Sequence, residues 1–346
     1  MDRLKLYFGI ILFSFLYLGC GTSKISFYEI PAEFRSPEKR IDFSEKYYPY
    51  LKGKSFFIDP GHGGKERGNL GFEKFDDEAD INLRVSLYLR QFLIEAGASV
   101  FMSRIADTTI SLADRSTIAD SSGAYIFISI HHNAPATAGD IWTDYTSTYY
   151  HAREGDYDYE PAEGDLARFV QRDLSYAVRN SGGLGSFDGT YSDYIIYPGE
   201  GFSVLRKTKI PAILVECAYS TNHFEAGRLK EEEFNKIEAW GIFRGLCRYL
   251  KTGIPEIKYL DNPDSLNISD KFINVLLSDS AGIDLKSIKV YWDKNNVDEL
   301  LFDPYENILT ITVPDSFVGK HTLRVIAANK NGNHSFPFLK EITIVQ

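Results

Sequence analysis

The stretch SFFIDPGHGG, residues 55–64, joins an apolar run to an acid, a proline and a histidine that lies among three glycines. Phe56, Phe57 and Ile58 are typical of a buried strand. The glycines allow the backbone to turn sharply and leave little steric bulk near the ring of His62. The stretch therefore predicts a core strand that ends by presenting a histidine at the edge of a sheet.

Strands and helices alternate along the chain from this point to about residue 251. The runs SFFID, SVFMS, YIFISI and AILVECAY indicate buried strands, and helical spacing or capping indicates helices over residues 78–96, 112–120, 166–180 and 231–250. Such alternation is typical of an α/β domain with a mainly parallel sheet flanked by helices. In these sheets, functional sites form beyond the carboxyl ends of the strands.

The pattern changes after the segment KTGIPEIKYLDNP. Short runs such as FINVLLSD, SIKVYWD and HTLRVIAA, several with alternating polarity, are separated there by turn-rich pieces. We expect residues 255–346 to form a small all-β sandwich, which resembles the immunoglobulin-like modules of bacterial surface proteins. Tyr291, Trp292 and Phe302 are interpreted as core or groove-lining aromatics, and the partner of this domain is left open.

The first 20 residues have the features of a secretory signal peptide, because Arg3 and Lys5 precede an apolar run. That run is about 13 residues long, shorter than the roughly 20 needed to span a bilayer. Its ending, LYLGC, resembles the lipobox of bacterial lipoproteins, which implies lipidation of Cys20 and a membrane anchor. Simple cleavage or a retained anchor are the alternatives. Residues 21–50 are polar and irregular, which suits a tether or a segment wrapping the next domain.

Composition limits the class of function. The chain has a formal net charge of −10 and no basic block, so a nucleic-acid partner is not expected. Its 346 residues favour two domains, which we place at residues 51–254 and 255–346. Cys217 and Cys247 do not make a disulfide framework and are interpreted as small buried apolar residues.

Residues that can bind metal stand where predicted elements begin or end. His62 follows the first strand, His131 and His132 end the strand in FISIHHNA, and Glu78 opens the first helix. Two imidazoles and one carboxylate form the ligand set that leaves zinc an open position for water. Successive side chains of a strand face opposite ways, so only one of the adjacent histidines points into such a site, and the pattern does not choose between them.

Two acids accompany these candidate ligands. Glu216 lies near the end of the apolar strand AILVECAY, where burial of a charge is costly unless it is paired, bound to metal or neutralised. A general base beside a metal-bound water would explain its position, and a structural ion pair is the alternative. Asp59 could orient His62 or stabilise the turn.

At these residues the chain resembles a known family. DPGHGG, EADINL, SRIADTTISLADRSTIAD, ISIHHNA and VLRKTKIPAILVECAYSTN stand in the order and spacing of the zinc-dependent N-acetylmuramoyl-L-alanine amidases of bacterial cell walls. The resemblance covers about residues 53–251. It implies that His62, Glu78 and His131 bind Zn²⁺ and that Glu216 is the catalytic glutamate.

The resemblance also bears on residues that the pattern leaves open. It selects His131 over His132, because the family places the ligand directly after Ser-Ile and two residues before an asparagine. That asparagine is Asn133, which we expect to contact substrate. Arg206 could bind a carboxylate of the stem peptide, with an exposed ion pair as the equal alternative.

Two features depart from the family pattern. Ala218-Tyr219 and Thr221-Asn222 replace the Gly-Phe and Ser-Asn that usually follow the catalytic acid. The segment over residues 139–165 is longer than a minimal connection and rich in Asp, Glu and Tyr, which suits a lid or, equally, a solvated loop. His151 in this segment is not expected to bind metal, because a fourth protein ligand would close the water site.

The expected function follows from the resemblance. It implies hydrolysis of the amide between N-acetylmuramic acid and L-alanine in peptidoglycan, by a zinc-activated water with Glu216 as general base and acid. The signal and lipobox imply an exported lipoprotein of the bacterial cell envelope that faces the periplasm. A peptidoglycan-binding lipoprotein without activity and a zinc peptidase acting on stem peptides are the alternatives.

Overall fold

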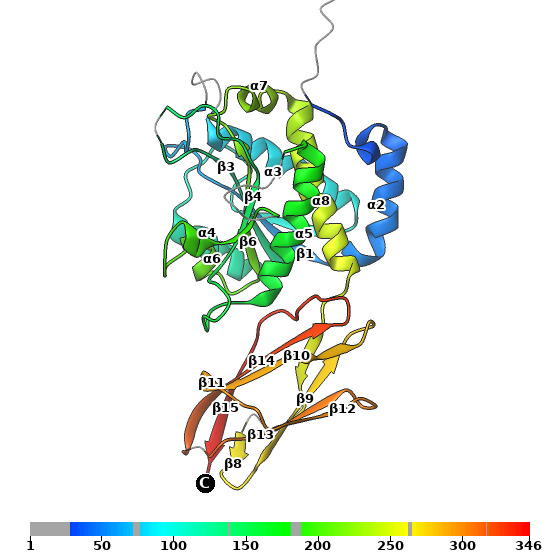
Figure 1. Cartoon of the computed structure of the whole chain (residues 1–346), viewed down its shortest axis with the longest axis vertical. Coiled ribbons are helices and arrows are strands. Elements are labelled where there is room, and N and C mark those ends of the chain that lie inside the picture. Colours follow the sequence, from blue (N-terminus) through cyan, green and yellow to red (C-terminus); the bar gives the residue numbers. More distant parts are fainter. Residues whose placement is uncertain (1–27, 72–76, 138, 181–187, 262–264, 316) are drawn as a thin grey trace, which may run out of the picture.

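The computed structural model describes residues 28–71, 77–137, 139–180, 188–261, 265–315 and 317–346. In the view of Figure 1, an α/β part lies above a β-rich part. The α/β part ends with helix α8 (Glu232–Lys251), and the β-rich part begins with strand β7 (Glu256–Tyr259). This order agrees with the predicted fold class.

A six-stranded mixed sheet lies at the centre of the α/β part, in the order β2-β1-β3-β6-β4-β5. Its strands span Ser55–Pro60 (β1), Ser99–Met102 (β2), Ile126–Asn133 (β3), Ser147–Tyr150 (β4), Thr190–Ser192 (β5) and Ala212–Tyr219 (β6). β1, β2, β3 and β6 are mutually parallel, whereas β4 is antiparallel to β6. The carboxyl ends of β1, β3 and β6 therefore meet at one edge of the sheet.

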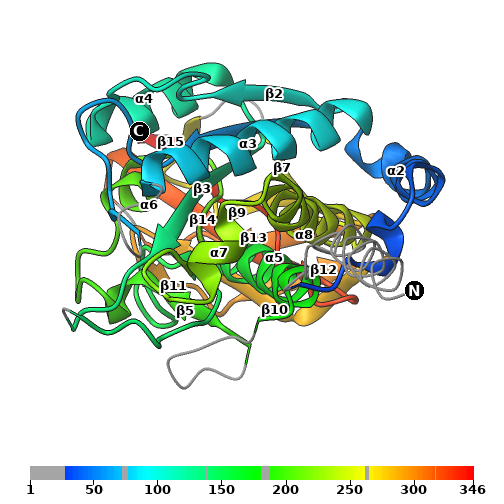
Figure 2. The same cartoon turned by 90° about the horizontal axis from the view of Figure 1, so that it is seen from above.

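Helices cover both faces of this sheet, as Figure 2 shows from above. They span Glu78–Glu95 (α3), Leu112–Ser122 (α4), Pro161–Val178 (α5), Ser203–Lys207 (α6) and Glu232–Lys251 (α8), and the short α7 spans Glu225–Leu229. α3, α5 and α8 bury strand side chains such as Ile128 and Val215. α4 and α6 lie over Phe127 and Leu214 on the opposite face. Alternate strand residues thus enter two separate cores.

The close packing of α5 on α8 depends on two glycines. A Cβ atom added at Gly245 would lie 2.6 Å from the Cα atom of Val170, and one added at Gly241 would lie 2.8 Å from the Cα atom of Leu174. Both distances are too short for non-bonded carbon atoms. Glycine at these positions lets the two helix backbones approach each other.

The segment before the sheet differs from the irregular tether that the sequence suggested. A 3₁₀ turn over Ala32–Phe34 (η1) leads into helix α2 (Pro37–Leu51), whose first turn is capped by the Ser36 side chain. Phe34 and Leu51 are buried in the core beside α8. The segment therefore wraps the α/β part, which was the other interpretation of its sequence.

The acidic segment over residues 139–165 is not loop throughout. It contains strand β4, which is inserted between β6 and β5, and the first residues of α5. Ser147, Thr148 and Tyr149 are buried. The sequence interpretation did not include this strand, because Ser and Thr do not stand out as core residues, although their backbones pair within the sheet.

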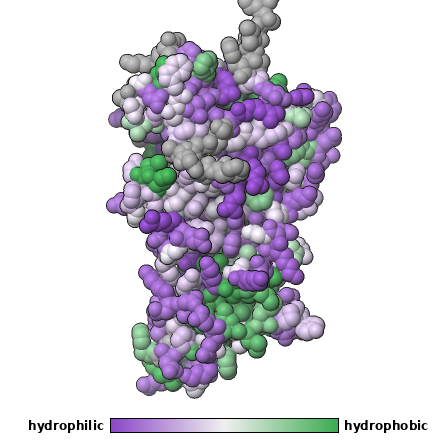
Figure 3. Space-filling view, in the orientation of Figure 1, coloured by the Kyte–Doolittle hydropathy of each residue, from purple (hydrophilic) through white to green (hydrophobic). Residues whose placement is uncertain are grey.

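The β-rich part consists of two sheets in the orders β11-β10-β14-β15-β8 and β12-β13-β9-β7. Its strands after β7 span Ser265–Asn267 (β8), Phe272–Ser278 (β9), Ile283–Trp292 (β10), Asn295–Asn296 (β11), Leu300–Asp303 (β12), Ile308–Thr312 (β13), Gly319–Asn329 (β14) and Phe338–Val345 (β15). Val275 and Ile311 from one sheet and Trp292 and Val325 from the other share one core. Apolar residues also gather on the visible surface of this region in Figure 3.

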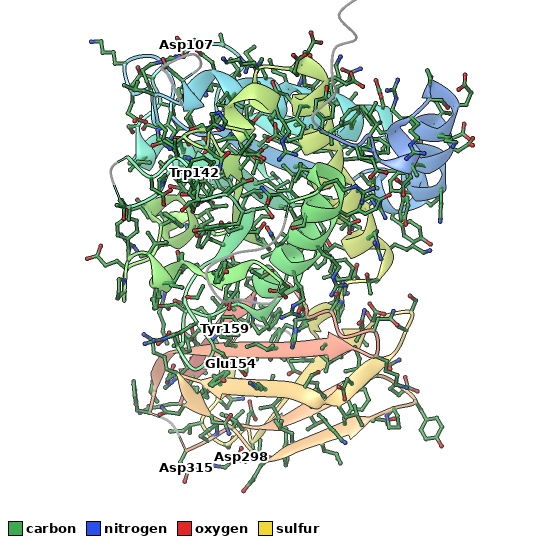
Figure 4. The ribbon with its side chains drawn as sticks, turned by 45° about the horizontal axis from the view of Figure 1, so that its top comes forward. Asp107, Trp142, Glu154, Tyr159, Asp298 and Asp315 are labelled. Atoms are coloured by element: carbon green, nitrogen blue, oxygen red, sulfur yellow. The ribbon has the colours of Figure 1, made fainter. Side chains whose placement is uncertain are left out.

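Polar contacts join the β-rich part to the amino ends of the strands of the α/β part. Arg324, 3% exposed, donates hydrogen bonds to the carbonyls of Tyr157 and Tyr159. The ring of Phe336 lies 4.6 Å from that of Tyr125, which immediately precedes β3. Figure 4 shows Tyr159 beside the β-rich part and Asp107 at the far end of the molecule. The β-rich part is therefore attached away from the carboxyl ends of β1, β3 and β6.

Within the part of the chain that the structure describes, none of the helices is long and apolar enough to cross a bilayer. The predicted signal peptide and Cys20 lie outside the described residues.

Candidate metal centre and active site

Three side chains converge at the carboxyl edge of the sheet. His62 follows β1, His131 lies near the end of β3, and Glu78 is the first residue of α3. The Glu78 Oε1 atom lies 3.0 Å from His62 Nε2 and 3.0 Å from His131 Nδ1. One possible ligand atom from each of the three residues lies within 4.8 Å of the others. The structure thus brings together the three residues predicted as metal ligands.

Two glycines make room for this cluster. A Cβ atom at Gly61 would lie 2.2 Å from Cε1 of His131, and one at Gly68 would lie 2.4 Å from Oε2 of Glu78. His62 itself has a φ angle of +61°, in the left-handed region that non-glycine residues rarely adopt. The loop of residues 61–68 is therefore shaped to bring backbone close to the imidazole and carboxylate groups.

Glu78 is buried and held as a carboxylate. Burial alone would raise its pKa, but hydrogen bonds and charges from His131 and His62 outweigh burial and hold the pKa well below its ordinary value. Asn69 donates to its Oε2 atom from both backbone and side chain, each at 3.0 Å. Asn82 donates to its Oε1 atom at 3.3 Å. The Asn69 contacts hold the oxygen that does not face the histidines, and the Asn82 contact holds the one that does, so the orientation of the carboxylate is fixed through both oxygens.

His132 faces away from this cluster, into the core between the sheet and α8. Its Nδ1 atom lies 2.7 Å from Oδ1 of Asn82, and its Nε2 atom lies 3.0 Å from Oε1 of Glu238. Cys217 completes a second group of potential ligands with His132 and Glu238, and all three are buried. The geometry therefore assigns His131 to the open site and His132 to the interior, as the family resemblance implied.

Glu216 lies beside the cluster on the neighbouring strand. Its Cα atom is the registered partner of the His131 Cα atom in the β3–β6 pair. The Oε2 atom of Glu216 is buried and has no hydrogen-bond partner among the described residues. Burial raises the pKa of this carboxyl well above its ordinary value, and the charge of Glu78 raises it further. The ion pair that was the alternative for this acid is absent from the described residues.

A cavity of about 860 Å³ opens onto these four residues. Its lining includes Thr109 in the segment before α4, Leu112 at the start of α4, and Tyr197 and Phe202 between β5 and α6. Asn133 and Arg206 also line it, so both residues predicted to bind substrate face the same cavity. Arg206 donates to the backbone carbonyl of Glu200, and its guanidinium lies 3.7 Å from the Glu200 carboxylate.

The residues present fit a divalent zinc ion. Two imidazoles and one carboxylate are ordinary zinc ligands, and three protein ligands leave a position for water or substrate. His62 and His131 are partly exposed, with 21% and 18% of their side chains accessible, so the site is reachable from the cavity. The partnerless Oε2 atom of Glu216 provides an acceptor beside that position.

Two predicted residues have structural contacts away from the metal cluster. Asp59 is fully buried and accepts hydrogen bonds from Arg115, Ser103 and Ser129, so it does not contact the His62 ring. His151 pairs with Asp193 at 2.9 Å and belongs to neither group of potential metal ligands. The contacts of Asp59 favour a role in stabilising the turn over a role in orienting His62.

Several residues around the site were missed by sequence reasoning. Asn69 and Asn82 hold Glu78, and Arg104 and Arg115 hold the loop that carries His62. The arginines stand within the motif SRIADTTISLADRSTIAD, but nothing in their spacing indicates which backbone groups they meet.

Comparison with known proteins places this geometry in a family. The sequence model described as N-acetylmuramoyl-L-alanine amidase matches residues 56–248, more than half of the chain. The chain belongs to the N-acetylmuramoyl-L-alanine amidase family. The match begins in β1 and ends in α8, so the family domain contains all four site residues.

Relatives of this amidase support the assignment. The uncharacterized protein YqiI of Bacillus subtilis is 31% identical over 199 residues, which cover 58% of this chain and 86% of YqiI. The N-acetylmuramoyl-L-alanine amidase LytC of Bacillus subtilis is 31% identical over 200 residues, but these are only 36% of LytC. The amidase Ami1 of Mycobacterium smegmatis superposes with a TM-score of 0.50 at 19% identity, covering 58% of this chain and 99% of Ami1, which shows the fold alone.

Proposed function

We propose that this amidase hydrolyses the amide bond between the lactyl group of N-acetylmuramic acid and L-alanine in peptidoglycan. We further propose that His62, Glu78 and His131 hold a zinc ion for this reaction. The observation that carries the proposal is the acceptor atom of Glu216, which is buried without a partner beside three converging metal ligands. A purely structural acid at that depth would be expected to be paired.

Glu216 would carry the proton in this reaction. A zinc ion bound by the three ligands would supply Lewis acidity for the scissile carbonyl and lower the pKa of a water molecule. The Glu216 carboxylate accepts a proton from the attacking water and donates it to the leaving amine of L-alanine. The products are then a free lactyl carboxyl group and a peptide with a free amino terminus.

The remaining cavity residues would bind the substrate. Arg206 would meet a carboxylate of the stem peptide, for which it must exchange its contact with the exposed Glu200. Asn133 would contact the peptide or the lactyl group beside the metal ligands. The apolar side chains of Leu112 and Phe202 on the cavity walls suit the aliphatic portions of such a substrate.

Location and domain organisation follow the same proposal. A relative in Staphylococcus aureus, the probable cell wall amidase LytH, is 28% identical over 200 residues and supports a place in the cell envelope or outside the cell. We propose that residues 51–254 form the catalytic domain and that residues 255–346 form an immunoglobulin-like domain. We also propose that Cys20 carries a lipid that anchors the protein to a membrane, with the protein facing the periplasm.

Digestion of purified sacculi, with and without a chelator, tests the proposed reaction. Mass analysis of the soluble fragments should reveal stem peptides that begin with L-alanine, and the chelator should prevent their release until zinc is restored. Cleavage between amino acids would instead favour a stem-peptide peptidase. Binding to sacculi without released fragments would favour a binding protein and reject the enzyme.

A further inference from the structure

Two buried arginines bind the backbone of the loop that carries His62. Arg104 donates to the carbonyls of Pro60 at 3.0 Å and Gly61 at 2.8 Å. Arg115 donates to the carbonyls of Pro60 at 2.8 Å and His62 at 2.7 Å. Three successive carbonyl groups are therefore each held by a guanidinium group, which fixes the path of the backbone on either side of the His62 side chain.

Arg104 also binds the segment that carries the second ligand. Its Nη2 atom donates to the carbonyl of Ala79 at 2.7 Å, in the first turn of α3 directly after Glu78. The planar guanidinium group thus bridges the His62 loop and the start of α3. The Arg104 side chain therefore connects the loop that carries His62 to the first turn of α3, which carries Glu78.

The bonding of Arg104 is unusual for a buried cation. The residue is 4% exposed, and among the described residues its hydrogen-bond partners are backbone carbonyls, including that of Ala106 at 3.3 Å. Burial and the nearby charge of Arg115 lower its pKa to about 10, so it remains a cation at neutral pH. Burial of a charge without a carboxylate partner is costly, so its several carbonyl bonds must compensate for lost hydration.

Arg115 differs from Arg104 because it has a carboxylate partner. It is also 4% exposed, and its guanidinium forms an ion pair with the fully buried Asp59 at 2.6 Å. Asp59 in turn accepts hydrogen bonds from Ser103 and Ser129, so Arg115 is anchored to β3 and to the end of β2. Arg115 thus fixes the His62 carbonyl relative to the sheet, while Arg104 fixes the loop relative to α3.

We propose that Arg104 and Arg115 are positioning residues that set the metal affinity of the site, by holding His62 and Glu78 in ligand geometry before an ion binds. This inference rests on the proposed zinc site, but it concerns the backbone that supports the site and not the reaction. Lysine cannot replace either arginine fully, because a single ammonium group cannot span carbonyls on two segments, as Arg104 does, or reach two carbonyls and the Asp59 carboxylate together, as Arg115 does.

Arg104→Lys tests the role of the bridge while keeping the charge. Zinc affinity of the purified variant is measured by competition with a chromogenic chelator, and the absorption spectrum of the cobalt-substituted protein reports the ligand geometry. We expect zinc affinity to fall by about 10- to 100-fold, the range found when groups that orient metal ligands are removed. The cobalt spectrum should change in shape or intensity as the ligand positions relax.

Arg324→Lys is the matched control. Arg324 is equally buried and also donates to two backbone carbonyls, with an added ion pair to Glu160, but it lies at the junction with the β-rich part, far from the ligands. Both lysine variants should lower the melting temperature, whereas only Arg104→Lys should weaken zinc binding. Equal zinc affinity in the two variants, with similar losses of stability, would overturn the proposal and leave Arg104 as a structural residue.

Arg115→Lys keeps the inference testable if the first variant does not fold. It should also weaken zinc binding, because it releases the carbonyl of His62, and unchanged affinity in a folded Arg115→Lys protein would contradict the proposal. If the wild-type protein itself binds no zinc, the proposed function fails. If the wild type binds zinc and a folded variant binds it equally well, only the positioning role fails.

Discussion

Strand β3 carries two adjacent histidines, and each meets a glutamate in a different setting. His131 faces Glu78 and His62 at the mouth of a cavity, with access from solvent. His132 faces Glu238 and Cys217 in the closed core, and both of its ring nitrogens already lie within hydrogen-bond distance of acceptor oxygens. Ligand types alone therefore do not distinguish the two clusters. Access separates the two clusters, because the side chains of His62 and His131 are partly exposed, whereas that of His132 is fully buried.

The largest expected effect comes from the acid beside the open cluster. Glu216→Gln removes the proton acceptor and keeps the shape, so we expect cleavage of sacculi to fall by about 100- to 10,000-fold. Zinc binding and binding to sacculi should be retained, because Glu216 is not among the three ligands. Release of fragments within tenfold of the wild-type rate would reject Glu216 as the proton carrier.

The two adjacent histidines should give opposite results when each is replaced by alanine. His131→Ala should abolish tight zinc binding with little change in the melting temperature of the metal-free protein. His132→Ala should retain zinc binding but lower the free energy of unfolding by about 3–5 kcal/mol, because Glu238 would stay buried and keep only its hydrogen bond from Asn235. Chelator competition and denaturant unfolding measure the two effects, and loss of zinc binding in folded His132→Ala would remove the distinction between the clusters.

A smaller effect is expected from the glycine that lies against the open cluster. Gly61→Ala would place a Cβ atom 2.2 Å from the His131 ring, so the ring must move and zinc affinity should fall by about 10-fold or more. Gly227→Ala is the control, because a Cβ atom there would have no neighbour within 4 Å. Equal zinc affinities of the two variants would mean that the ligand ring is not held as closely as the structure indicates.

The smallest effect concerns a histidine–carboxylate pair outside both clusters. Burial lowers the pKa of His321, but hydrogen bonds to Asp293 and to the Phe317 carbonyl outweigh burial and raise it above 6.5. A raised pKa in the folded state means that the pair stabilises the protein fully below pH 6.5 and loses this contribution as pH rises through the folded value. His321→Gln should therefore flatten the change in melting temperature between pH 6 and pH 8.5, and an unaltered slope would count against this charge pairing.

Much of the site could be predicted because its histidines and acids stand at the ends of apolar runs that the sequence identifies as strands. The apolar run before His62 and the acid in AILVECAY mark strand ends, and parallel strands bring their carboxyl ends together. Strand periodicity could not choose between His131 and His132, because adjacent residues differ only in the face they occupy. The family resemblance selected His131, and the structure places its ring beside His62 and Glu78 at the cavity.

Other parts of the fold escaped prediction for physical reasons. Helix α2 contains Pro49 and has few apolar residues, so its packing on α8 leaves a weak pattern. Strand β4 buries Ser147 and Thr148, whose polar side chains resemble those of a loop. The contacts of Arg104 with Pro60 and Gly61 join residues more than 40 positions apart, and no local pattern encodes such a tertiary contact.

The central claim is that His62, Glu78 and His131 form the metal site and that the His132 cluster does not. Anomalous diffraction at the zinc edge, from crystals grown with one equivalent of zinc, tests it most directly. We predict a single peak about 2.0–2.2 Å from one atom of each of these three residues. A peak beside His132, Glu238 and Cys217, or no peak at the open cluster, would contradict it.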